Sequence, residues 1–116
     1  MIEHRIGSRP IGAPGGSGVD MSFLLGPAVT SINTVRIVSG EVLGDPPTDV
    51  WKVLYVLAGL VEVTGSDDSG PQILTLEPEQ AVQWAPGEQH SSKALVDSLV
   101  VIIEATERVP SGLPRL

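Results

Sequence analysis

The longest apolar run of the chain extends from Asp49 to Val63 and is interrupted by Gly59. It is rich in β-branched and aromatic residues, which favour a strand over a helix. Alternate side chains of a strand point to opposite faces. One face would carry Trp51, Val53, Tyr55 and Leu57, and the other Lys52, Leu54, Val56 and Ala58. Because both faces are largely apolar, we expect a barrel interior to cover one and a second sheet or subunit the other.

Five further segments show strand patterns between turn residues. They cover residues 19–25, 30–43, 72–76, 80–84 and 95–105, with a bend expected at Gly40. The polar segment 64–71 is typical of a hairpin connection between antiparallel strands. No segment shows a convincing helical period. The pattern therefore predicts an all-β sandwich or barrel.

The length of 116 residues and the hydrophobic content of 41% predict one domain with a single core. Glycine and proline are frequent in residues 9–18, a composition that does not support a regular element by itself. We therefore expect a flexible arm over residues 1–20, a barrel domain over 21–109 and a loose tail over 110–116.

Charge and composition exclude several classes of function. The formal net charge is −7 and no basic cluster offsets it, so we expect no nucleic-acid partner. The chain lacks cysteine, which removes disulfides and thiolate metal sites. No signal peptide and no segment of membrane-spanning length is present, so we expect a soluble, cytoplasmic protein without a membrane partner.

Two groups of glycine, proline and polar residues have a defined spacing. In the first, Gly40 is followed after five residues by Pro46-Pro47-Thr48, then after three residues by Lys52, and after six more by Gly59. In the second, Glu79 precedes the turn Ala85-Pro86-Gly87, and His90 and Ala94 follow it. Nineteen residues separate the two groups.

This spacing, over about residues 35 to 105, resembles the two motifs of the cupin family of jelly-roll barrels. The resemblance implies a small single-domain, RmlC-like jelly roll. The family carries histidines where this chain has Pro46 and Thr48, and a glutamate where it has Lys52. In the second motif a glycine and an asparagine are replaced by Glu79 and Ala94. The alternative is that Gly40, Gly59 and Gly87 are turn glycines of another β-sandwich.

The replaced ligands argue against a metal. The family's centre is similar to a three-histidine, one-carboxylate site, and a divalent ion needs about three protein ligands. Of the motif histidines only His90 remains, and an ammonium at Lys52 repels a cation. We therefore expect no metal and no cofactor. A metal-dependent dioxygenase with atypical ligands stays an alternative, in which Lys52 is neutral or one of Asp49, Glu41 and Asp97 turns inward.

The residues that remain at the motif positions suit acid–base chemistry. We predict His90 and Lys52 as catalytic residues, with Thr48, Leu54 and Val56 binding the ligand in the barrel pocket. A lysine in an apolar pocket binds an anion or polarises a carbonyl, and a histidine moves protons near neutral pH. The prediction is a metal-independent isomerase, cyclase or lyase acting on a small carbonyl or carboxylate compound.

Structural roles are the alternative for the same residues. Lys52 would then extend to the rim or pair with Asp49 or Glu41, and His90 would bond the Ala85-Pro86-Gly87 turn. The protein would in that case be a non-catalytic barrel that binds a small molecule or serves as an accessory protein.

The outward face of the long run predicts self-association. Trp51, Val53, Tyr55 and Leu57 in contact with water would form a large apolar patch. A symmetric homodimer would cover this patch, and members of the resembled family commonly pair through sheet faces.

Overall fold

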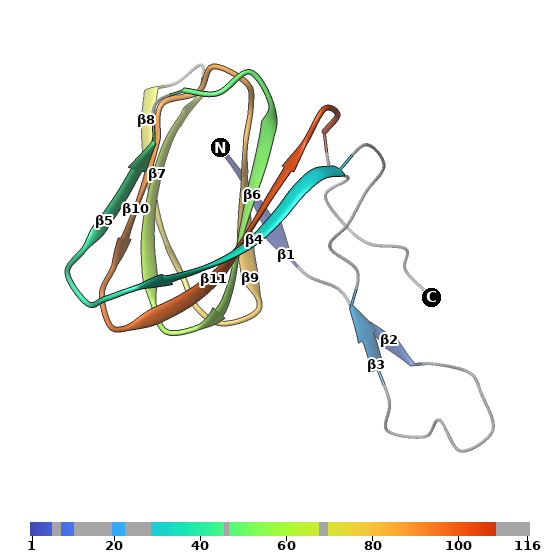
Figure 1. Ribbon diagram of the computed structural model, residues 1–116, viewed down its shortest axis with the longest axis vertical. Coiled ribbons are helices and arrows are strands. Elements are labelled where there is room, and N and C mark those ends of the chain that lie inside the picture. The colour runs from blue at the N-terminus through green and yellow to red at the C-terminus, as the bar shows by residue number, and fades with distance from the viewer. Residues whose placement is uncertain (6–7, 11–19, 23–28, 46, 68–69, 109–116) are drawn as a thin grey trace.

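The computed structural model describes residues 1–5, 8–10, 20–22, 29–45, 47–67 and 70–108, and within them every regular element is a strand (Figure 1). The described part of the chain therefore has no helix long and apolar enough to cross a membrane. The strands are β1 (Ile2–Arg5), β2 (Ser8–Pro10), β3 (Asp20–Ser22), β4 (Val29–Ile37), β5 (Val42–Asp45), β6 (Trp51–Ala58), β7 (Val61–Asp67), β8 (Gly70–Leu76), β9 (Gln80–Trp84), β10 (His90–Ala94) and β11 (Ser98–Ala105).

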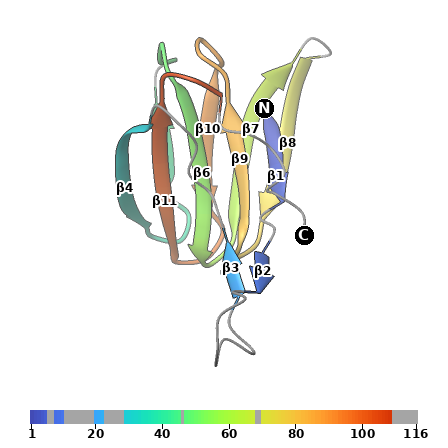
Figure 2. The same ribbon diagram turned by 90° about the vertical axis from the view of Figure 1, so that its right-hand side faces the viewer.

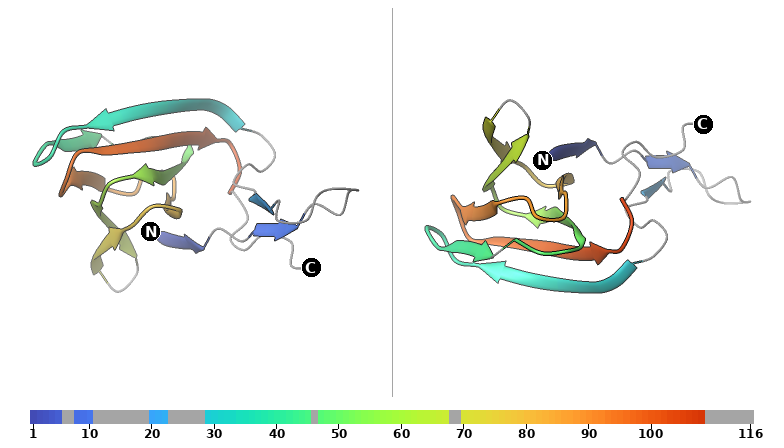
Figure 3. Two further views of the ribbon diagram at one scale, coloured as in Figure 1. Left: turned by 90° about the horizontal axis from the view of Figure 1, so that it is seen from below. Right: turned by 90° about the horizontal axis from the view of Figure 1, so that it is seen from above.

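Two antiparallel sheets make up the body of the protein. The five-stranded sheet has the order β1-β9-β6-β11-β4, and the four-stranded sheet has the order β5-β10-β7-β8. The strands of the two sheets run up and down in two layers (Figure 2). β2 and β3 form a separate pair beside these layers (Figure 3). The all-β prediction is confirmed, and the two layers enclose an interior between them.

Two of the predicted strands are each two strands in the structure. Residues 30–43 divide at Gly40 into β4 and β5, and the long run divides at Gly59 into β6 and β7. In both cases the two halves belong to different sheets. The expectation of one bent strand was wrong because each glycine makes a full turn that carries the chain from one sheet to the other.

Other predicted boundaries agree more closely. β9 matches the predicted segment 80–84, and β8 contains 72–76. β7 and β8 form the predicted hairpin, but its predicted connection 64–71 was too long, because β7 continues to Asp67 and β8 begins at Gly70. β10 was not predicted. Of the segment 19–25, only residues 20–22 lie within the described residues, where they form β3. Residues 2–5 of the predicted arm pair with β9 as β1.

The inner faces of the two large sheets share one hydrophobic cluster. Leu54 and Val56 of β6 have no exposed surface. The buried members of this inner cluster are Ile37, Leu54, Val56, Val61, Val63, Leu76, Val82, Trp84, Ala94, Val100 and Ile102. Burying one such aliphatic side chain contributes roughly 1.5 to 3 kcal/mol. The inner cluster therefore holds the two sheets together, and both sheets present alternate residues to it.

The opposite face of the five-stranded sheet carries a second, smaller cluster. Val53, Ala81, Ile103 and Ala105 are each at most 1% exposed, and Tyr55 and Val101 pack against them. Of the residues that the sequence predicted on the outward face of β6, Val53 belongs to this cluster and Tyr55 packs against it. Val53 is fully buried, Trp51 and Tyr55 are half-buried, and Leu57 is exposed. The homodimer itself stays a prediction.

The turns at the motif positions use left-handed backbone. The φ angle is 100° at Gly59 and 73° at Glu79. Gly40 and Gly87 also have positive φ. At Gly59 a side chain would overlap the hydroxyl of Ser98 and approach the carbonyl oxygen of Asp97 to 2.7 Å. Glu79 keeps the conformation that glycine favours, which supports its alignment with the family's first glycine of the second motif.

We expect Gly59→Ala to destabilise the protein by more than about 1 kcal/mol, because left-handed backbone alone costs an L residue about 1 to 2 kcal/mol and the new Cβ meets Ser98. Urea unfolding followed by tryptophan fluorescence measures the change. The matched control is Gly44→Ala, because Gly44 has open space around it and no positive φ. Equal stability of the two variants would contradict this account of the turn.

Tyr55 gives a prediction for alkaline pH. Burial raises the pKa of Tyr55 above its ordinary value of 10.0, and the carboxylate of Glu79 raises it further. The folded state thus favours the neutral phenol. Its contribution to stability is complete below the ordinary pKa and is lost as the pH rises through the folded pKa.

Tyr55 is the only tyrosine of the chain, so absorbance titration reports on this side chain alone. We expect Glu79→Gln to lower the pKa of Tyr55 but to leave it above 10.0, because burial is the larger cause. Glu77→Gln, in the same turn, serves as the control. A pKa that does not change in Glu79→Gln would show that this carboxylate has no influence on the phenol.

Candidate functional site

His90 is the first residue of β10 and lies directly opposite Asp45 of β5. Its side chain is 8% exposed. Ser92 and Ala94, which alternate with it on the strand, are also buried, whereas Ser91 and Lys93 are on the outer face. His90 therefore presents its imidazole to the interior between the sheets, as the motif resemblance predicts.

The hydrogen bond of His90 defines its neutral tautomer. Nδ1 lies 3.0 Å from the backbone oxygen of Glu88. A carbonyl oxygen only accepts, so we assign the ring proton to Nδ1, which donates to Glu88. Nε2 then carries a lone pair. This atom is buried and has no hydrogen-bond partner among the residues that the structure describes, a condition that costs roughly 1 to 3 kcal/mol unless a bound group satisfies it.

Trp84 covers one side of the His90 ring. The two ring centroids are 4.6 Å apart and the planes are tilted by 30°. The indole is 2% exposed, and its Nε1 donates to the backbone oxygen of Thr64 at 2.9 Å. Trp84 comes from the five-stranded sheet and His90 from the four-stranded sheet, so the ring contact joins the two layers. No pattern in the sequence indicates this contact between Trp84 and His90.

Lys52 shares the inner face of β6 with Leu54 and Val56 and is only 5% exposed. It lies opposite Trp84 in the pairing of β6 with β9, and opposite Glu104 in the pairing of β6 with β11. Side chains directly opposite in a sheet have Cβ atoms about 5 Å apart. Lys52 and His90 are thus both neighbours of Trp84, one from each sheet.

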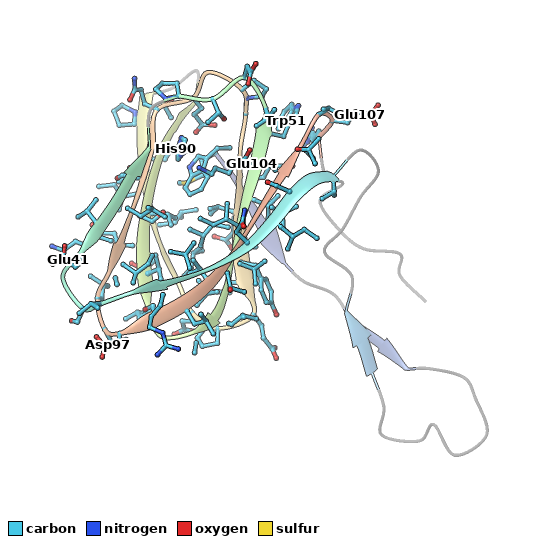
Figure 4. The ribbon with its side chains drawn as sticks, in the orientation of Figure 1. Glu41, Trp51, His90, Asp97, Glu104 and Glu107 are labelled. Atoms are coloured by element: carbon cyan, nitrogen blue, oxygen red, sulfur yellow. The ribbon has the colours of Figure 1, made fainter. Side chains whose placement is uncertain are left out.

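Glu104 is the carboxylate that the sequence interpretation missed. It follows Val100 and Ile102 at alternate positions of β11, and both of these belong to the inner cluster. Glu104 therefore faces inward, where it is half-buried. In Figure 4 it lies in the same half of the molecule as His90. The period-two pattern of residues 95–105 contained this signal.

The proposed inward carboxylates are on the surface. Asp49, Glu41 and Asp97 are all exposed. Glu41 and Asp97 lie at the end of the barrel opposite His90 (Figure 4), where Asp97 accepts a hydrogen bond from the backbone nitrogen of Ser39 at 2.8 Å. None of the three supplies a group to the interior.

The predicted ligand-binding residues occupy different environments. Leu54 and Val56 are fully buried in the inner cluster. Thr48 lies in the loop before β6, where its hydroxyl donates to the backbone oxygen of Val50 at 3.1 Å and its own carbonyl accepts from Gly87 at 2.7 Å. The structure thus brings Lys52, Leu54 and Val56 to one wall, adds His90 through Trp84, and directs the hydroxyl of Thr48 to its own loop.

Two surface hollows lie outside the inner cluster. The larger, of about 540 Å³, follows β7, β8 and β10 and is lined in part by Thr64, Gln72, Ile73, His90 and Ser91. The smaller, of about 310 Å³, is lined in part by Arg36 and Asp97 and includes neither Lys52 nor His90. His90 therefore borders a surface hollow as well as the interior.

The described residues do not make a metal site of the family's type. Among them, no group of three histidine, cysteine, aspartate or glutamate side chains is close enough to hold an ion. Thr48 and Lys52 occupy two of the family's ligand positions with groups that suit a cation poorly. The donor set around His90 therefore does not fit a three-histidine, one-carboxylate centre.

Comparison with known proteins gives matches by structure only. No protein-family model and no curated protein matches the chain. A TDP-fucose-3,4-ketoisomerase from Campylobacter jejuni is similar with a TM-score of 0.71 and 10% identity, over 91% of this chain and 82% of that one. A cupin superfamily protein from Desulfitobacterium hafniense is similar with a TM-score of 0.60 and 17% identity, over 75% of each chain.

Two further proteins are similar over about two thirds of this chain. A protein of unknown function from Streptococcus pyogenes has a TM-score of 0.58 and 15% identity, over 67% of this chain and 65% of that one. An oxalate decarboxylase from Bacillus subtilis has a TM-score of 0.58 and 17% identity, over 63% of this chain and 20% of that one. This chain thus spans about two thirds of the first and a fifth of the second.

The class of protein follows from these matches and from the two facing sheets. The chain has the cupin fold, a single-domain jelly roll of antiparallel strands, with replaced residues at the metal-ligand positions of the motifs. Likeness at these identities establishes the fold, and the function must be argued from the residues around His90.

Proposed function

We propose that this protein is a metal-independent enzyme that moves a proton on a small carbonyl or carboxylate compound, in the manner of an isomerase. The observation that supports this proposal most directly is that Nε2 of His90 is buried and has no hydrogen-bond partner among the described residues. The similar fold of a ketoisomerase from Campylobacter jejuni is consistent with this class of reaction.

His90 would act as the general base. Its Nδ1–H donates to the carbonyl of Glu88, which leaves Nε2 as the proton acceptor. When Nε2 takes a proton from a carbon next to a carbonyl group, the same bond to Glu88 stabilises the imidazolium that forms. In an α-hydroxy carbonyl compound this gives an enediolate. When Nε2 returns the proton to the former carbonyl carbon and the hydroxyl proton moves to the other oxygen, the carbonyl group has moved by one carbon with no net change in oxidation state.

Lys52 would stabilise the negative charge of the enolate oxygen. Its side chain lies on the inner face next to Trp84, and its ammonium attracts an anion more strongly inside a barrel than in water. Glu104, opposite Lys52 in the pairing of β6 with β11, places a carboxylate on the same wall.

A non-catalytic role in binding is the second candidate. Leu54 and Val56 have no exposed surface, and the hydroxyl of Thr48 is engaged with Val50. Apolar side chains and an engaged hydroxyl offer contact to a small compound but no group that reacts with it, which favours binding without transformation. The two candidates differ in whether His90 exchanges a proton with the compound.

Hydrogen exchange into carbonyl compounds tests the proposed enzyme. The protein is incubated in heavy water with a set of α-hydroxy aldehydes, α-hydroxy ketones and 2-oxo acids, and loss of the α-proton signal is followed by NMR. We expect His90→Asn to slow the exchange by about 100-fold or more, a usual contribution of a general base. We expect Lys52→Met to slow it as well, by a smaller factor.

Matched variants separate chemistry from general damage. His4→Asn removes the only other histidine, and Lys93→Met removes the only other lysine, which is exposed on β10. Both should exchange at the wild-type rate. Exchange that continues unchanged in His90→Asn would refute the enzyme, whereas binding without exchange in the wild type would favour the second candidate.

We also propose that the chain forms a homodimer. Leu57 at the end of β6 and Ile32 on the edge strand β4 are 44% and 52% exposed, which leaves apolar surface on the five-stranded sheet for a second copy to cover. Sedimentation equilibrium should give twice the 12.1 kDa mass of one chain. A mass of one chain at all concentrations would rule out the dimer.

A further inference from the structure

The pairing of β7 with β10 ends next to His90. The last register pair is Thr64 with Ser91, whereas β7 continues to Asp67. Here the side chains of Trp84, the last residue of β9, and of Glu88, between β9 and β10, bind the backbone of β7. Trp84 Nε1 donates to the oxygen of Thr64 at 2.9 Å, and the nitrogen of Ser66 donates to Glu88 Oε2 at 2.8 Å.

Glu88 connects this backbone to the imidazole. Its Oε1 accepts from the nitrogen of Ala85 at 3.0 Å, and the amino group of Met1 lies 2.7 Å from Oε2. The side chain is 7% exposed. The backbone oxygen of the same residue receives the proton of His90 Nδ1. The carboxylate thus fixes the carbonyl that selects the His90 tautomer.

The imidazole is therefore held from two directions. Glu88 binds its edge at Nδ1, and Trp84 packs against its face. Glu88 and Trp84 are hydrogen-bonded to the backbone of β7 on either side of Gly65. A change that moves Glu88 or Trp84 would release the ring, which could then place a proton on Nε2 instead of Nδ1.

Because Gly65 has no side chain, Glu88 and Trp84 can both approach β7 at this residue. A Cβ built at this residue would lie 2.5 Å from Glu88 Oε2 and 3.1 Å from Trp84 Nε1, and 2.6 Å from the Cβ of Met1. Distances below about 3 Å do not occur for real Cβ atoms, so a side chain here must displace its neighbours. The atoms nearest to this Cβ belong to Glu88, Met1 and Trp84, so Gly65 would influence the His90 ring through Glu88 and Trp84.

We propose that Gly65 and Trp84 are positioning residues that keep His90 in the Nδ1-protonated form with its Nε2 lone pair directed into the barrel. This inference deepens the proposed function, because only the unprotonated Nε2 can act as the base. The missing side chain at Gly65 allows Glu88 and Trp84 to approach β7, and these two residues then fix the edge and the face of the imidazole.

The tautomer can be measured without any substrate. The protein is labelled with ¹⁵N-histidine in a His4→Gln background, so that His90 gives the only histidine signals. A two-dimensional ¹H–¹⁵N NMR spectrum at alkaline pH correlates the protons on the ring carbons with both ring nitrogens. The nitrogen shifts then distinguish the protonated nitrogen from the unprotonated one. For the parent protein we expect one set of signals, with the proton on Nδ1.

Two variants test the positioning residues. We expect Gly65→Ala to produce a second set of ring signals with the proton on Nε2, and Gly44→Ala, at an open position, to leave one set. Trp84→Phe keeps an aromatic ring but cannot donate to Thr64, and we expect it to produce the second set as well. Trp51→Phe, on the outer face of the sheet, is its control and should retain one set.

The tautomer measurement can fail or succeed independently of the hydrogen-exchange assay. A single, unchanged Nδ1-protonated form in folded Gly65→Ala and Trp84→Phe would overturn the positioning role, even if His90 proves to be a base. If Gly65→Ala does not fold, Trp84→Phe alone decides. Mixed tautomers in the variants support the positioning role whether or not any tested carbonyl compound exchanges its proton.

Discussion

Strand β6 buries side chains on both of its faces, and this constrains the strands that pair with it. On one face Leu54 and Val56 join the inner cluster between the sheets, and on the other Val53 belongs to a separate cluster. β6 pairs with β9 and with β11, so both neighbours must also contribute to the two clusters. The position of β6 therefore fixes the direction in which Lys52, Trp84 and Glu104 point.

The candidate site is a consequence of this arrangement. Lys52 and Trp84 reach the interior from the five-stranded sheet, and His90 reaches it from the four-stranded sheet. Among the described residues, Nε2 of His90 has no hydrogen-bond partner, and a buried acceptor without one lowers the stability of the fold. The proposed chemistry gives the lone pair of His90 Nε2 a function, because it would accept a proton from a bound compound.

The sequence predicted the fold class and the inward side chains of β6, because strand alternation and glycine spacing are local patterns. It also predicted that His90 and Lys52 face the interior. It did not predict that Gly40 and Gly59 carry the chain between sheets, because a local pattern does not say which sheet the next strand joins. β10 was missed because its buried positions are polar or small, as in His90 and Ser92. The contacts of Glu88 depend on β7, which is more than twenty residues away.

Glu79 adopts a left-handed backbone that glycine would accept more easily. Its neighbours hold it there, since its nitrogen donates to the oxygen of Val56 at 2.8 Å. The surrounding strands thus impose a turn that its local sequence does not favour. The backbone path at this corner of the jelly roll is therefore set by a bond to a distant strand more than by the residue that occupies it.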